Sequence, residues 1–236
     1  MRPLQTLPAV IGLLAAGCAG PALSPEDAER KRLYTEAVEP CKAKYPAMRD
    51  VEVDQYGYVS ASAMSWSAEV DGFRRCVNQA FMALGDVKPR SAGKVAANAS
   101  NTKIAYQPVG AMLFVPVVLN GVSGTFLLDT GAGVTTIHPA FAERAGIDVP
   151  ARAPRVLLTV AGGGQYSVPM VTAKSVRVGE ASVEAIDIGI FSGLSPTRQG
   201  VARDGILGVD FLRHFRMTVD RQDRLLILDL PEKRRQ

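Results

Sequence analysis

Asp129 is an acidic residue at a position in the sequence where its carboxylate could take part in a reaction. Asp129 follows a run with strand character, residues 125–128, and precedes Thr130, Gly131 and Ala132. A carboxylate at the end of a buried strand is costly unless another group pairs with it or a reaction uses it. Gly131 lets the backbone turn sharply and approach a partner closely. The same residue types also form ordinary acidic turns, so the triplet alone leaves both interpretations open.

The elements around Asp129 are predicted to be β-strands. Residues 114–119 have strand character, Asn120 and Gly121 form a strong tight-turn pair, and residues 125–128 return and deliver Asp129. Short strands recur further along the chain without a long helix between them, which indicates an all-β barrel or sandwich. The later strands are predicted at residues 155–160, 166–171, 175–178, 183–190, 217–219 and 225–230, and short helices at 139–145 and 210–215.

One of these predicted hairpins has an unusual tip. Gly162, Gly163 and Gly164 stand in a row between its two strands. An ordinary turn needs only one or two glycines, so a tip of three is expected to move freely.

Three segments in this order resemble the aspartic peptidases. The Phe-Leu-Leu-Asp-Thr-Gly-Ala run that contains Asp129 resembles their active-site loop. The run that contains Ile206, Leu207 and Gly208 resembles the later strand that crosses behind that loop, and the glycine-tipped hairpin lies where the family has its flap. The resemblance is to the single-lobe, retropepsin-like branch in its bacterial exported form, and it covers residues 105–231. It implies a mainly β fold with a retropepsin-like closed β-barrel.

The resemblance also implies a site made by two chains. Peptide hydrolysis in this family uses two carboxylates that share one proton. The sequence contains one Asp-Thr-Gly triplet and no Asp-Ser-Gly. We therefore expect a homodimeric aspartic endopeptidase in which each chain contributes Asp129, Thr130 hydrogen-bonds across the two-fold axis, and Gly131 permits close approach. The hairpin tipped by residues 162–164 is expected to close over a polypeptide substrate. The resemblance implies neither a cofactor nor a metal.

Other functions are still open from the sequence. A catalytically inactive module for binding or assembly in the cell envelope would keep the fold and also carry a single Asp-Thr-Gly. A purely structural envelope lipoprotein is the weaker alternative, because a structural turn does not require Asp-Thr-Gly-Ala.

The N-terminal region is predicted to be a separate unit. Residues 19–85 are expected to form a small α-helical domain with two helices, at about residues 25–44 and 67–84. Cys41 and Cys76 would tie these helices together. An even pair of cysteines in an exported chain indicates a disulfide, with two free thiols as the alternative.

The composition of the chain indicates whether it folds and whether it binds nucleic acid. The 236-residue chain is 47% hydrophobic and 21% charged, which indicates a globular body rather than disorder. Its net charge is +4, but Lys and Arg are scattered until the basic tail, residues 232–236, so nucleic-acid binding is not expected. Residues 86–104 show no periodic pattern and are predicted to be a flexible linker between the two domains.

Residues 1–18 are predicted to be an export signal rather than part of the fold. Their apolar run, residues 7–16, is too short to span a bilayer as a mature helix. The Leu-Ala-Ala-Gly-Cys run resembles the bacterial lipoprotein signal, in which Cys18 becomes the lipidated first residue, but it has Ala15 where that signal more often has Leu. Cleavage after a small-residue pair without a lipid is the alternative. Ala19 favours the outer membrane, so we expect a periplasmic protein with a lipid anchor on Cys18.

Replacing Cys18 tests this anchor. Cys18→Ser removes the thiol that would carry the lipid, so the variant should incorporate no fatty-acid label and should lose its membrane attachment. Labelling and cell fractionation measure both effects, with Ala19→Ser as a control that keeps the thiol. Normal processing and unchanged fractionation of Cys18→Ser would mean an ordinary secretory signal.

Overall fold

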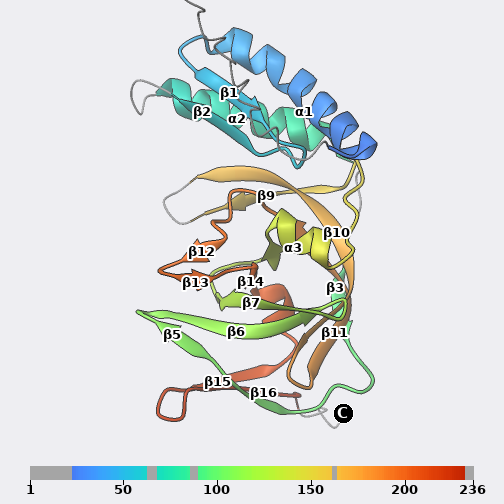
Figure 1. The fold of residues 1–236 in the computed structure, drawn as a ribbon, viewed down its shortest axis with the longest axis vertical. Helices are drawn as coiled ribbons and strands as arrows, with labels where there is room; N and C mark the ends of the chain where they lie inside the picture. Colours follow the sequence, from blue (N-terminus) through green and yellow to red (C-terminus); the bar gives the residue numbers. More distant parts are fainter. Residues whose placement is uncertain (1–22, 63–67, 86–89, 161–163, 232–236) are drawn as a thin grey trace, which may run out of the picture.

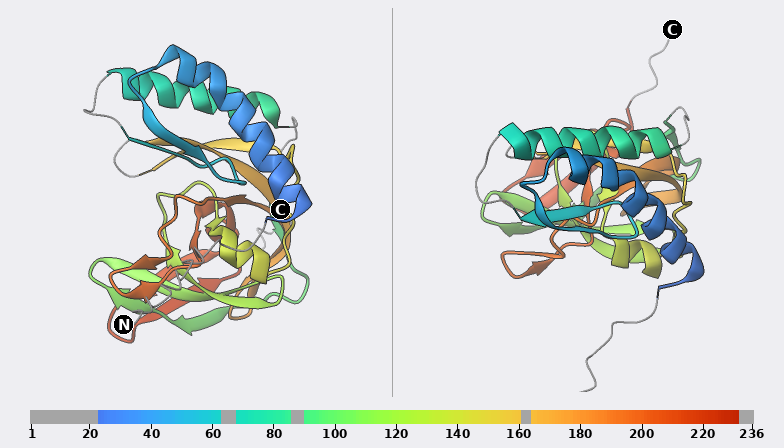
Figure 2. Two further views of the ribbon diagram at one scale, coloured as in Figure 1. Left: turned by 45° about the horizontal axis from the view of Figure 1, so that its top comes forward. Right: turned by 90° about the horizontal axis from the view of Figure 1, so that it is seen from above.

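The computed structural model has a helical N-terminal part and a larger β part, stacked along the long axis of the molecule (Figure 1). It describes residues 23–62, 68–85, 90–160 and 164–231. The predicted export signal with Cys18, the basic tail, and Gly162 and Gly163 lie outside these described residues. Seen from above, the two long helices lie across one end of the β part (Figure 2).

The N-terminal part contains both predicted helices and the predicted disulfide. Helix α1 spans Pro25–Lys44 and helix α2 spans Ala68–Leu84. Cys41 and Cys76 are bonded with an S–S distance of 2.05 Å, which joins the two helices. The two helices bury a small core of their own. The buried side chains of this core are Tyr34, Val38, Cys41, Val53, Phe73, Val77 and Phe81.

This part is not wholly helical, which corrects the expected domain type. Strands β1, Arg49–Val53, and β2, Val59–Ser62, pair as an antiparallel hairpin. The Asp54 carboxylate closes the turn between them by accepting from the backbone N–H groups of Tyr56 and Tyr58, both at 2.8 Å. Most side chains of these short strands are at least partly exposed, so their sequence lacks the apolar alternation that identifies a strand.

The β part contains fourteen of the described strands and two short helices. The strands are β3 Ala92–Val95, β4 Thr102–Ala105, β5 Gln107–Val109, β6 Met112–Leu119, β7 Val122–Leu128, β8 Thr136–Ile137, β9 Arg155–Thr159, β10 Gln165–Val178, β11 Ala181–Ile190, β12 Thr197–Arg198, β13 Val201–Ala202, β14 Gly205–Leu207, β15 Arg216–Asp220 and β16 Leu225–Asp229. The helices are α3 Pro139–Arg144 and α4 Val209–Leu212.

Six of these strands close into a barrel. Their order is β11-β8-β14-β7-β6-β10. Because β10 also pairs with β11, none of these six strands is an unpaired edge strand of the ring. A separate three-stranded sheet has the order β15-β16-β4. The fold is mainly β, and its closed barrel agrees with the predicted architecture.

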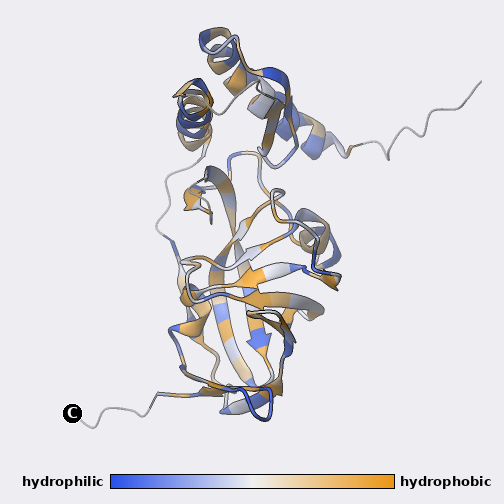
Figure 3. Ribbon diagram, turned by 90° about the vertical axis from the view of Figure 1, so that its left-hand side faces the viewer, coloured by the Kyte–Doolittle hydropathy of each residue, from blue (hydrophilic) through white to orange (hydrophobic). Residues whose placement is uncertain are grey.

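Apolar side chains fill the barrel. Hydrophobic residues are prominent along the barrel strands, whereas the N-terminal helices carry many hydrophilic residues (Figure 3). Full burial of each large apolar side chain is worth about 1.5–3 kcal/mol. The largest fully buried ones in this core include Leu119, Phe126, Ile137, Phe141, Ile186, Ile188, Ile190, Leu207 and Phe211.

Two sequence predictions for the β part are wrong. Strands predicted at residues 166–171 and 175–178 form one continuous strand, β10, because its pairing changes from β9 to β11 along its length without a turn. Residues 86–104 are not simply a linker, because β3 pairs with β11 and β4 pairs with β16. Both strands are four residues long, which is too short to show a periodic pattern.

Polar contacts join the N-terminal part to the β part. The Tyr56 hydroxyl donates to the Glu143 carboxylate on α3 at 3.0 Å. The guanidinium of Arg30, which is buried, donates to the backbone carbonyl of Val149. The two parts are therefore connected by side-chain contacts as well as by the chain itself.

Removing the disulfide tests the stability of the N-terminal part. The bridge joins residues 35 positions apart, and the entropy of a loop of that length corresponds to about 3–4 kcal/mol. The double variant Cys41→Ser/Cys76→Ser should therefore unfold at a lower urea concentration, with a loss of about that size. Chemical denaturation followed by circular dichroism measures it. An unchanged midpoint, or two free thiols in periplasmic material, would contradict the bridge.

Candidate active site

Asp129 leaves the barrel at the end of β7, between two neighbouring strands. The β6–β7 hairpin turns through Asn120 and Gly121, whose φ values of 51° and 89° both lie in the left-handed region that suits a two-residue hairpin. On its other side β7 runs parallel to β14, with Leu128 opposite Leu207. The Asp129 N–H continues this ladder by donating to the Leu207 carbonyl at 3.1 Å. These pairings fix the direction in which the chain enters the loop.

The loop after β7 folds back on the Asp129 carboxylate. The Gly131 N–H donates to Asp129 Oδ1 at 2.8 Å, and the Ala132 N–H donates to the Asp129 carbonyl at 3.2 Å. Asp129 is half-buried, whereas Thr130 and Gly131 are exposed. The carboxylate therefore lies at the mouth of the loop, oriented by a backbone N–H and still open to a reacting group.

The strand that delivers Asp129 is less buried than the sequence predicts. Phe126 is completely buried, but Leu127 and Leu128 are only half-buried. Both leucines lie beside Asp129 at the end of the barrel, where the described residues cover them incompletely.

Gly208 follows β14 and lies directly against this loop. A Cβ atom at Gly208 would be 2.7 Å from the carbonyl carbon of Val134, 2.8 Å from the Ala132 oxygen and 2.9 Å from the Thr135 nitrogen. All three atoms belong to the backbone and cannot easily yield. The Val209 N–H also donates to the Ala132 carbonyl at 2.7 Å. The structure thus places the predicted Ile-Leu-Gly run beside the loop, and the contact requires a glycine.

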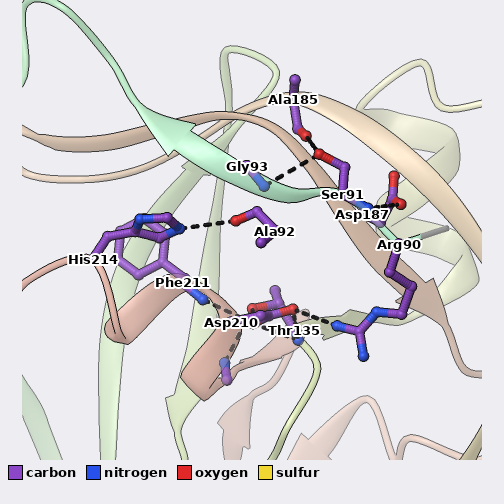
Figure 4. Close-up of polar contacts among 11 residues, drawn as sticks. Arg90, Ser91, Ala92, Gly93, Thr135, Ala185, Asp187, Asp210, Phe211 and His214 are labelled. Carbon is purple, nitrogen blue, oxygen red and sulfur yellow. Dashed lines mark hydrogen bonds and ion pairs between the residues drawn. The ribbon is translucent and has the colours of Figure 1, made fainter.

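A buried acid that the sequence analysis did not identify holds the loop from behind. Asp210 is only 4% exposed. Its carboxylate accepts from the Thr135 N–H at 2.8 and 2.9 Å and from the Thr135 hydroxyl at 2.6 Å, and that hydroxyl accepts from the Gly208 N–H at 3.1 Å (Figure 4). An acid inside the apolar run Val-Asp-Phe-Leu was the signal that could have revealed it, because a buried carboxylate needs partners.

The segment that enters β3 passes close to Asp210. The Arg90 guanidinium lies 3.7 Å from Asp210 Oδ2, and the His214 ring contacts the Ala92 carbonyl at 2.8 Å (Figure 4). The Ser91 N–H donates to the buried Asp187 carboxylate at 2.6 Å. Arg90 is 40% exposed, so its ion pair stabilises little. The segment is fixed mainly by its hydrogen bonds.

Two other ionisable residues near the loop have structural roles. Asp204 accepts from the Thr125 N–H at 2.8 Å and pairs with Arg144 at 2.6 Å, which fixes the start of β14 beside β7. His138 caps α3, because its Nδ1 accepts from the Ala140 N–H at 3.1 Å. Desolvation lowers the pKa of His138, which favours the neutral ring that this cap requires.

The hairpin of β9 and β10 is the one that the sequence analysis predicts to be a flap. Its described end is closed by a hydrogen bond from the Val160 N–H to the Gly164 carbonyl at 2.8 Å. The hairpin lies between the N-terminal part and the rest of the barrel (Figure 1). A cavity of about 510 Å³ lies between this hairpin, α2 and the β1–β2 hairpin. The Asp129 loop is not among the described residues that line the cavity.

Neither a metal centre nor a membrane helix is found in the described ranges. No group of three or more His, Cys, Asp or Glu side chains in these ranges could hold a metal ion. No helix within the same residues is long and apolar enough to cross a membrane.

Comparison with known proteins yields one sequence family and several solved structures. Residues 115–211 match the family described as Aspartyl protease. No curated protein matches the chain. A retropepsin-like aspartic protease from Rickettsia conorii has 22% identity and a TM-score of 0.39, covering 60% of this chain and 96% of its own. The retroviral protease-like domain of Ddi1 from Leishmania major has 21% identity and a TM-score of 0.34, covering 52% and 96%.

Two alanine substitutions test how the loop is held. Gly208→Ala should displace the Asp129 loop and destabilise the fold by about 1–3 kcal/mol, because the new Cβ meets backbone atoms. Gly133→Ala is the matched control in the same loop, since nothing lies within 4 Å of its Cβ position. Thermal unfolding and amide spectra of both variants measure the effect. Equal stability of the two variants would contradict the proposed close contact.

Proposed function

We propose that the protein is an aspartic endopeptidase that works as a homodimer, on the basis of the match of residues 115–211 in its β part to the family described as Aspartyl protease. Each chain would contribute Asp129 to one shared pair of carboxylates, and the substrate would be a polypeptide. The family match covers the Asp129 loop, β14 and the hairpin between them, which are the elements such a site needs.

The position of Asp129 carries this proposal. A purely structural carboxylate is normally surrounded by donors, as Asp210 is, but Asp129 is half-buried at the mouth of its loop. Thr130 and Gly131 are exposed beside it, so a second copy of the chain could approach them across a two-fold axis. The single Asp-Thr-Gly triplet means that one chain supplies only half of a carboxylate pair.

The chemistry then follows from two carboxylates that share one proton, since like charges in close contact cannot both ionise. The ionised Asp129 takes a proton from water while the water oxygen bonds to the peptide carbonyl carbon. The protonated Asp129 of the other chain gives its proton to the carbonyl oxygen. As the tetrahedral intermediate collapses, the Asp129 that took the proton from water gives it to the amine nitrogen, and the C–N bond breaks. A hydroxyl of the intermediate returns a proton to the Asp129 of the other chain, which restores the pair.

The β9–β10 hairpin would complete the site as a flap. Strand β10 continues from the barrel, where it pairs with β6 and β11, into the hairpin with β9. The hairpin would cover a bound polypeptide and exclude water from the carboxylate pair. Gly164 is the described member of its three-glycine tip.

We further propose that the protein is exported to the periplasm and attached to the outer membrane through a lipid on Cys18. This part of the proposal rests on the sequence of residues 1–18 alone.

Asp129→Asn is the direct test of the catalytic role. The substitution keeps the shape of the side chain and removes both carboxyl groups of a homodimeric pair, so peptide cleavage should fall by several orders of magnitude while the fold survives. Asp223→Asn, in the exposed turn between β15 and β16, is the matched control. Cleavage of a peptide library from acid to neutral pH measures both variants. Full activity of Asp129→Asn would exclude Asp129 from the site.

Mixed dimers test whether the site is shared. If wild-type and Asp129→Asn chains exchange freely at a one-to-one ratio, about a quarter of the dimers contain two aspartates, so about a quarter of the activity should remain. Retention of about half would show that each chain works alone. Absence of cleavage by the wild type under all conditions would favour an inactive binding module.

A further inference from the structure

We infer that the N-terminal part is a brace that holds the β9–β10 hairpin in place over the active site, with Asn78 and Arg155 as positioning residues. This inference rests on the proposed peptidase function and deepens it, because it assigns the N-terminal part a role in substrate binding. The contacts that carry it come from α1, α2 and the β1–β2 hairpin.

Asn78 attaches α2 to the free edge of β10. Its Nδ2 donates to the Gln165 carbonyl at 3.0 Å, and its Oδ1 accepts from the Ser167 N–H at 2.9 Å. Successive residues of a strand point their backbone groups to alternate sides, so Gln165 and Ser167 both face away from β9. The Asn78 side chain, only 8% exposed, therefore hydrogen-bonds to this edge as a neighbouring strand would.

Arg155 attaches the other end of the hairpin to both helices. Its Nε donates to the Ser167 hydroxyl at 2.9 Å and its Nη2 to the Ser167 carbonyl at 2.7 Å. Its Nη1 donates to the Tyr34 hydroxyl on α1 at 3.0 Å, and the guanidinium lies over the rings of Tyr34 and Phe81, at 4.9 and 5.1 Å. Desolvation lowers the pKa of Arg155, which reflects how closely these groups enclose it.

An aromatic contact adds a third attachment. Tyr58, at the end of the β1–β2 turn, stacks on Tyr166 of β10 with ring centroids 5.9 Å apart and an interplanar angle of 20°. Tyr58 also packs edge-on against Phe191 at 6.3 Å. These rings join the turn, the hairpin strand and the segment after β11.

The three attachments leave the hairpin little freedom to move alone. An isolated two-stranded hairpin is at best marginally stable in water, and a flap of that kind must be ordered when substrate binds. Here Arg155 fixes the base of the hairpin, and Asn78 fixes Gln165 next to its described end. The hairpin is therefore already ordered before substrate binds, and binding loses less conformational entropy. Loss of the brace should weaken substrate binding more than it slows the chemical step.

Asn78→Ala tests the brace, with Gln79→Ala on the exposed side of the same helix as the control. In Asn78→Ala the Ser167 amide should exchange with solvent about tenfold faster or more, because it loses its acceptor. The KM for a cleaved peptide should rise about three- to tenfold with kcat changed less than twofold. Amide exchange by NMR and steady-state kinetics give the two readouts. Gln79→Ala should match the wild type in both.

The outcomes separate this inference from the proposed function. Unchanged exchange at Ser167 in folded Asn78→Ala overturns the brace, whatever the activity. Faster exchange with an unchanged KM overturns the positioning role. If the wild type cleaves no peptide, both the proposed function and the positioning role fail. Amide exchange at Ser167 still decides whether the brace exists. If Asn78→Ala does not fold, Asn78→Leu replaces it, because leucine fills a similar volume and removes both hydrogen-bonding groups, and the same outcomes apply.

Discussion

The burial of one carboxylate, that of Asp210, fixes the geometry on which the candidate site depends. A buried carboxylate without partners would cost several kcal/mol. Thr135 supplies two donors to Asp210, and its hydroxyl also accepts from the Gly208 N–H, so the loop, β14 and α4 share one hydrogen-bond network. Because Gly208 has no side chain, the two backbones can approach closely enough for this network to form. This network fixes the position of Asp129 at the mouth of its loop.

The N-terminal part gives the β9–β10 hairpin a comparable constraint. Asn78 of α2 bonds to Ser167, and Arg155 of β9 bonds to Tyr34 of α1, so both helices are connected to the hairpin. The disulfide between Cys41 and Cys76 keeps those helices together. The molecule thus has a loop held by Asp210 and Gly208 and a hairpin held by the N-terminal part. Catalytic and binding groups act best when the surrounding structure has already set their positions.

Much of the fold was predictable because its signals are local. Asn120 and Gly121 identify the β6–β7 hairpin, since both need positive φ values, and the run before Asp129 marks a strand that ends in an acid. Cys41 and Cys76 were predicted to pair, and they do. Asp210 and Asn78 were not identified as structural residues, because their partners Thr135 and Ser167 lie 75 and 89 positions away in the sequence. Short strands such as β3 and β4 were missed for the same reason: their partners define them, not their own pattern.

If one active site needs two chains, as we propose, the activity of the protein must depend on the concentration of the chain. Peptidase activity per chain should be measured over a range of chain concentrations, with the dimer fraction at each concentration determined by sedimentation. Activity per chain should rise in proportion to the dimer fraction and vanish where only monomer is present. Constant activity per chain in samples that are entirely monomeric would contradict this proposal.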